Sequence, residues 1–140
     1  MDNRLITSKF NQIAAEQLKQ VDMNAYQNCQ KLATPRLNDL SLLPIVFEEI
    51  TKLYPKNPEN SPFILAVIYY LYAPFKLHYR EIRMRNGVRE MLCQLMMWKH
   101  VEIVNYYADI LISYYKGPRW AEKVNEMGNE IYELLKEFDE

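Results

Sequence analysis

Glycine and histidine are scarce in this sequence, which has three glycines and two histidines among 140 residues. No glycine-rich run resembles a phosphate-binding loop or a dinucleotide-binding fingerprint. His78 and His100 lie far apart and belong to no cluster with zinc-ligand spacing. Cys93 can be paired with either histidine on paper, but it occupies a small, apolar helical position where an inert thiol is expected. We therefore expect no enzymatic activity, no cofactor, no metal and no small-molecule substrate.

Cysteine and long apolar runs are also rare. Cys29 and Cys93 each lie in an apolar helical pattern, which predicts buried thiols in a reducing compartment and no disulfide. The longest apolar run, residues 63–75, is shorter than the roughly 20 residues that span a bilayer. The polar start of the chain does not resemble a secretory signal. These observations predict a soluble, cytoplasmic protein without a membrane partner.

The sequence also lacks a large excess of positive or negative charge, since its formal net charge is −1. The charges are nevertheless segregated along the chain. Residues 76–100 carry six basic and two acidic side chains, whereas residues 121–140 carry two basic and seven acidic ones. The basic block is either a solvated helix face paired with the acidic end or a surface for phosphate groups.

Low glycine content and prolines near the expected element ends predict an all-α protein, a compact bundle of five to seven helices in one domain over residues 1–140. The predicted helices span residues 5–32, 44–53, 63–72, 74–84, 88–96, 99–115 and 118–138. Helix 63–72 is apolar on all sides, so we expect it at the centre of a core formed by residues 62–138. The long helix within residues 1–34 has one narrow apolar stripe. It packs either on the rest of the chain or on a second copy, which would make it a self-association element.

Residues 89–109 follow the apolar rhythm of a helix-turn-helix unit. The expected apolar places hold Leu92, Met96, Trp98, Ile103 and Tyr106, and the expected small place holds Cys93. The ninth place, in the turn, usually holds glycine because the backbone there has a positive φ, but this chain has Met97. The stretch is either a helix-turn-helix-like unit at 88–115 or a plain helical hairpin.

Basic and amide side chains around this unit are the candidate DNA contacts. An asparagine at the start of the second helix can read adenine in the major groove, and lysine and arginine can hold phosphates. The candidates are Arg80, Arg83, Arg85, Arg89, Lys99, His100, Asn105, Lys116 and Arg119. Glu102 and Asp109 place negative charge on the same helix, which favours the plain hairpin.

Three short motifs support a resemblance to a known class. They are Leu71-Tyr72-Ala73-Pro74, Arg85-Asn86-Gly87-Val88-Arg89 and Tyr114-Tyr115. The run from Leu71 to Leu135 resembles small helix-turn-helix-like proteins of bacterial phages and mobile elements. This resemblance implies a DNA-binding regulator, or a packaging or assembly factor, with double-stranded DNA and self-association or another protein as partners. The alternative is a non-enzymatic structural or adaptor protein that binds other proteins through its Tyr- and Met-rich helices.

Overall fold

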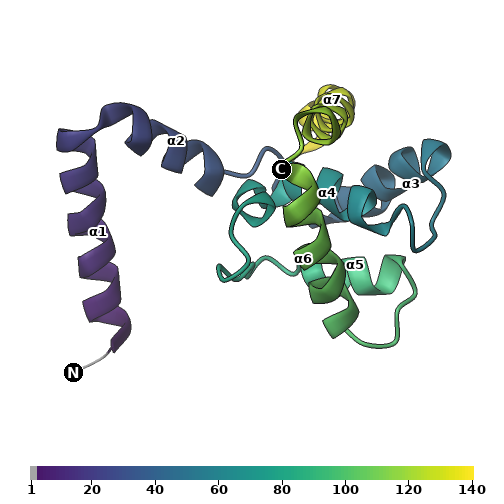
Figure 1. Cartoon of the computed structure of the whole chain (residues 1–140), viewed down its shortest axis with the longest axis horizontal. Coiled ribbons are helices and arrows are strands. Elements are labelled where there is room, and N and C mark those ends of the chain that lie inside the picture. The colour runs from purple at the N-terminus through teal and green to yellow at the C-terminus, as the bar shows by residue number, and fades with distance from the viewer. Residues whose placement is uncertain (1–2) are drawn as a thin grey trace. The chain divides into compact units, whose positions relative to one another are not determined.

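The computed structural model describes the backbone of residues 3–140 and the side chains of residues 8–140. Residues 1 and 2 and the side chains of residues 3–7, where the predicted first helix begins, lie outside this description. The predicted all-α fold is confirmed, because the described residues form seven α-helices and no strand (Figure 1). The helices are α1 (Asn3–Val21), α2 (Met23–Ala33), α3 (Leu43–Leu53), α4 (Ser61–Tyr72), α5 (Val88–Leu95), α6 (Glu102–Tyr115) and α7 (Pro118–Leu135). Short 3-10 helices, η1 (Leu40–Leu42), η2 (Pro74–Leu77) and η3 (Lys136–Phe138), adjoin α3, α4 and α7.

The chain divides into two compact units, residues 1–33 and residues 34–140. The first unit contains α1 and α2, where the sequence predicts one continuous helix. That prediction is wrong at Asp22, whose side chain accepts a hydrogen bond from the backbone N–H of Ala25 at 3.1 Å. An aspartate in this position starts a new helix by satisfying a free N–H of its first turn. Cys29 on α2 is exposed, so its predicted burial is also wrong, whereas Cys93 is partly buried against the core.

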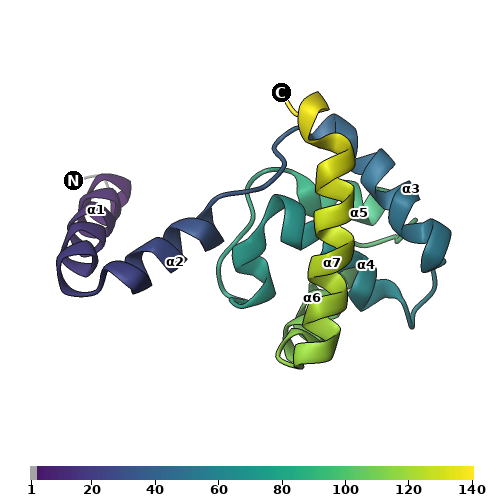
Figure 2. The ribbon, with the colours of Figure 1, turned by 90° about the horizontal axis from the view of Figure 1, so that it is seen from above.

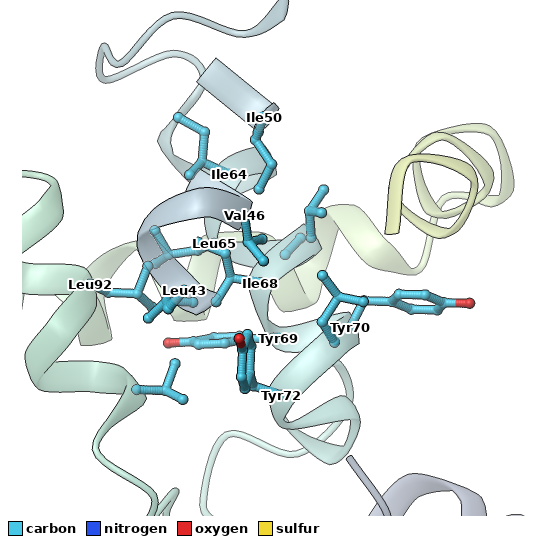
Figure 3. Close-up of a cluster of buried hydrophobic side chains, with 14 of the residues drawn as sticks. Leu43, Val46, Ile50, Ile64, Leu65, Ile68, Tyr69, Tyr70, Tyr72 and Leu92 are labelled. Atoms are coloured by element: carbon cyan, nitrogen blue, oxygen red, sulfur yellow. The ribbon is translucent and has the colours of Figure 1, made fainter. Parts of the chain in front are cut away.

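The second unit is built around α4, whose residues are all buried, as the sequence predicts. Helices α3, α6 and α7 pack on it, and α7 runs across α4 and α6 (Figure 2). Apolar side chains of α3, α4 and α5 meet in the centre of this core (Figure 3). None of the described helices has the length and apolar character needed to cross a membrane.

Two tyrosines of α4 point in opposite directions within the core (Figure 3). The Tyr70 hydroxyl donates to Asn129 Oδ1 of α7 at 2.6 Å, and the Arg36 guanidinium lies 3.7 Å from the Tyr70 ring centre. The Tyr69 hydroxyl, in contrast, is buried and has no hydrogen-bond partner among the described residues. Burial raises the pKa of Tyr69, and the positive charge of Arg89 acts in the opposite direction. The hydroxyl is therefore neutral in the folded protein at ordinary pH.

Candidate nucleic-acid interface

Five of the six basic side chains of residues 76–100 gather around one pocket of about 700 Å³, which we call the basic pocket. Its basic lining residues are Lys76, Arg80, Arg83, Arg85 and Arg89. They come from η2, from the loop 78–87 and from the first turn of α5. Asn105, Ala108 and Asp109 of α6 line the pocket as well, with Glu81 and Met84 of the loop. One continuous stretch, residues 76–89, thus places its cations beside one face of α6.

Residues 74–84 do not form the predicted helix. After the single 3-10 turn of η2, in which Leu77 is buried, the chain continues as an irregular loop with Tyr79 and Ile82 exposed. Lys76 explains this shape, because its ammonium donates to the carbonyl oxygens of Arg80 at 2.8 Å and Ile82 at 2.9 Å. These carbonyls have a side-chain partner in place of a helical N–H. Burial lowers the pKa of Lys76, and the nearby carboxylate of Asp109 opposes that effect.

The far end of the loop is fixed to the core. Asn86 donates its side-chain amide to the Tyr72 carbonyl at 3.2 Å, and its side-chain oxygen accepts from the backbone N–H of Val88 at 3.3 Å. Gly87 directly precedes α5 and has a φ of 85°, a conformation that residues with a Cβ disfavour. The loop that carries Arg80, Arg83 and Arg85 is therefore held at both ends.

Carboxylates neutralise only part of the positive charge. Arg80 lies 3.8 Å from Asp109 of α6 and 3.5 Å from Glu81 of its own loop. Arg89 lies 3.7 Å from Glu90, which does not line the pocket. Within residues 8–140, Arg83 and Arg85 have no carboxylate within ion-pair distance. Because like charges repel, these two arginines are the groups that gain most from a bound anion.

The turn between α5 and α6 has the positive φ that the motif requires. Met97 adopts a φ of 59°, although it is not glycine. The N–H of Trp98 donates to the Cys93 carbonyl at 3.0 Å and that of Met97 to the Gln94 carbonyl at 3.1 Å. This is the Schellman pattern that ends many helices. The side chain of Met97 is 79% exposed, so packing contributes little to holding it there.

The second helix differs from the predicted register. It begins at Glu102 and not at Lys99. Its buried residues are Val104, Ala108 and Leu111, whereas Tyr106, predicted to face inward, is exposed. Tyr107 takes the inward role and stacks on Trp98 with ring centres 5.1 Å apart. Val104, Ala108 and Leu111 follow the four- and three-residue steps of one helix face, and Tyr106 lies on the opposite side of the helix from Val104.

The exposed face of α6 is largely polar. The exposed residues are Glu102, Asn105, Tyr106, Asp109, Ser113 and Tyr114. Asn105 and Asp109 on this face line the basic pocket. The face that contacts solvent is therefore also the face that the loop arginines adjoin.

The candidate residues fall into three groups. Arg80, Arg83, Arg85, Arg89 and Asn105 come together at the basic pocket. Lys99 and His100 lie exposed in the turn before α6, and Lys116 and Arg119 lie exposed where α6 gives way to α7; none of these four lines the pocket.

Lys76 belongs to the basic block but was not among the candidates. Its role depends on hydrogen bonds to carbonyls of a loop, and the sequence predicted a helix there. His78 is another residue whose setting appears only in the structure. It packs edge-on against Tyr115 at 5.4 Å, and burial lowers its pKa.

The described residues contain no group of three or more His, Cys, Asp and Glu side chains that could hold a metal ion. No protein-family model, no curated protein and no solved structure matches this chain. The function is therefore inferred from the basic pocket and from the helix beside it.

Proposed function

We propose that this chain is a small DNA-binding protein that contacts double-stranded DNA with the exposed face of α6 and holds the phosphate backbone with the arginines of the basic pocket. One observation carries the proposal: the basic loop and α5 place four arginines beside the polar face of α6. Phosphate contacts supply most of the affinity of DNA-binding proteins, and side chains of a helix supply sequence readout. The resemblance of residues 71–135 favours a regulator or packaging factor of a phage or mobile element.

Other basic residues flank α6 at both ends. Lys99 and His100 precede its first turn, and Lys116 and Arg119 follow its last turn. A helix of this length is about 21 Å long, which exceeds the roughly 12 Å width of the major groove. Cations at the two ends of such a helix are therefore placed to contact the backbones on the two sides of the groove.

The test is duplex binding measured by fluorescence anisotropy at about 50 and 200 mM salt. The full chain should bind at the lower concentration and lose affinity steeply at the higher one. The double variant Arg83→Ala/Arg85→Ala should reduce the slope of log K against log salt by about two, because each phosphate contact contributes roughly one. Lys123→Ala is the control, since it removes one exposed cation of α7 outside the pocket, and the slopes are compared per charge removed.

Absence of duplex binding at about 50 mM salt would exclude this function, since electrostatic attraction is strongest there. An equal loss of slope per charge removed in Lys123→Ala would mean that the net charge of the protein, and not the position of the arginines, determines the salt dependence. Asn105→Ala tests base readout separately. It should reduce discrimination between duplex sequences and leave the salt slope unchanged, because an asparagine contributes no charge.

A second candidate is a non-enzymatic adaptor that associates with other chains. Met97 and Tyr106 favour it, because large apolar side chains are exposed at the turn and on α6. In the first unit, Phe10, Ile13 and Val21 are exposed on α1. This function predicts an oligomer in light scattering that becomes a monomer when residues 1–32 are removed or in Met97→Gln/Tyr106→Ser. A full-length chain that is already monomeric argues against self-association.

A further inference from the structure

The basic pocket holds more uncompensated charge than a DNA backbone supplies at one point. Five basic side chains against two acidic ones leave three positive charges around a single concavity. DNA carries one charge per phosphate, spread along each strand at about 3.4 Å of axis per phosphate. A duplex presents these charges on its outer surface, so a concave pocket receives only one or two of them.

The two acidic side chains compensate weakly. The Glu81 side chain is 88% exposed, and its carboxylate comes no closer than 3.5 Å to the Arg80 guanidinium. The Asp109 carboxylate lies farther from the same guanidinium, at 3.8 Å. Both acidic groups thus approach the same arginine. Arg83 and Arg85 are left with exposed guanidinium groups that no described carboxylate approaches.

The size and lining of the pocket suit a small molecule. Its volume of about 700 Å³ lies within the range of roughly 300–1,000 Å³ that small-molecule sites occupy. Met84 and Ala108 give it an apolar part, and Asn105 adds an amide that both donates and accepts. Lys76 holds the loop through two carbonyls, so the arginines do not need a ligand to define their backbone positions.

We propose that the basic pocket binds a free small ligand with a short chain of phosphate groups, such as a nucleoside triphosphate. Guanidinium groups form bidentate hydrogen bonds with phosphate oxygens, and several arginines in one pocket match a compact ligand with three or four negative charges. If the chain also binds DNA as proposed above, the ligand and the duplex compete for Arg83 and Arg85. Only this competition depends on the proposed function; binding of the ligand itself does not.

The test is isothermal titration calorimetry of the full chain, without DNA, at physiological ionic strength and with EDTA so that no divalent cation neutralises the phosphates. The probes are ATP, tripolyphosphate, AMP and sulfate. We expect one ATP or one tripolyphosphate per chain, with AMP and sulfate at least about tenfold weaker because they carry fewer charged oxygens for the arginines. Arg80→Ala and Arg83→Ala/Arg85→Ala should weaken ATP binding, and Lys123→Ala should not.

Three results would overturn the proposal: no saturable binding of ATP or tripolyphosphate, AMP binding as tightly as ATP, or an equal loss in Lys123→Ala. The altered arginines are exposed, so unchanged thermal unfolding of each variant will show that lost binding is not lost folding. A chain that binds ATP but no duplex supports the pocket ligand and refutes the DNA function. A chain that binds duplex but no ATP does the opposite.

Competition is measured last. ATP should weaken duplex binding more than sodium chloride at the same ionic strength.

Discussion

Replacement of Gly128 by alanine should destabilise the protein, although alanine is the better helix former. Gly128 lies in the buried face of α7, directly against the Tyr70 ring of α4. A Cβ at this position would lie 2.2 Å from Tyr70 Cδ1 and 2.7 Å from Cε1, distances at which carbon atoms overlap. One of the two helices, or the ring between them, has to move.

The ring is not free to move. Its hydroxyl donates to Asn129 at 2.6 Å, Arg36 covers one face at 3.7 Å, and the same guanidinium donates to the Tyr70 carbonyl at 2.9 Å. Overpacking of a core costs about 1–3 kcal/mol, and a lost hydrogen bond adds about 1 kcal/mol. The gain from replacing glycine by alanine within a helix is only about 0.5–1 kcal/mol. We therefore expect a net loss of about 1–3 kcal/mol in the free energy of unfolding.

Urea unfolding followed by circular dichroism measures this difference, and a double-mutant cycle isolates its cause. In a Tyr70→Leu background the ring is absent, so Gly128→Ala should be neutral or stabilising by about 0.5–1 kcal/mol. A wild-type background in which Gly128→Ala is neutral would refute the reasoning. An equal loss in both backgrounds would show that the Tyr70 ring is not the obstacle.

Three further changes test other parts of the fold. Tyr69→Phe should stabilise the protein by about 1 kcal/mol in the same urea assay, because it removes a buried hydroxyl for which the described part of the chain offers no hydrogen-bond partner; destabilisation would reveal a partner. Met97→Gly should also stabilise, by about 0.5–1 kcal/mol, because glycine adopts the φ of 59° without strain; a loss would show that the exposed side chain makes an important contact. The pKa of His78 is lowered from 6.5 by burial, so the unfolded chain binds more protons, and stability should fall as the pH drops through 6.5 and below. His78→Asn should flatten this part of the pH profile, and an unchanged profile would contradict the assignment.

The helices that the sequence predicts best are those with a strong apolar pattern or clear end signals. Pro62 and Pro74 bracket α4, and its uniformly apolar residues leave no alternative to the centre of the core. The predicted ranges 88–96 and 118–138 agree with α5 and with α7 plus η3 to within a residue at most boundaries. Local chemistry is sufficient for such elements, because tertiary contacts and local preference favour the same structure.

Residues 74–84 show why the rest was not predictable. A helical pattern is visible there, but the ammonium of Lys76 bonds to two loop carbonyls, a contact that no periodicity encodes. The break at Asp22 is similar, because one side-chain hydrogen bond to Ala25 divides an otherwise continuous amphipathic pattern. The approach of α7 to Tyr70 is a third case, since the sequence shows a glycine in a helix but not the ring that requires it.

The same limit applies to the candidate interface. Composition identified the arginines of the basic block, and the α5–α6 pattern identified Asn105, but the pocket that unites them exists only because residues 78–87 form a loop. In a helix over 74–84, the side chains of Arg80, Arg83 and Lys76 would lie on the surface of that helix and would not surround a pocket. The positions of the charges can therefore be predicted from the sequence. The basic pocket cannot, because it depends on which carbonyls accept the hydrogen bonds of Lys76.

The effect that the sequence predicts for Asp109 on anion binding differs from the effect that the structure indicates. On a helix expected to contact DNA, an acidic residue argues against binding. In the folded chain its carboxylate lies 3.8 Å from Arg80, so its charge is directed at a cation. Both partners are about half exposed or more, and exposed pairs contribute only about 0–1 kcal/mol. A phosphate that makes bidentate hydrogen bonds to Arg80 can displace so weak a partner. Asp109 therefore reduces repulsion in the empty pocket without blocking an anion, and Asn105 remains as the neutral polar group on the same face of α6.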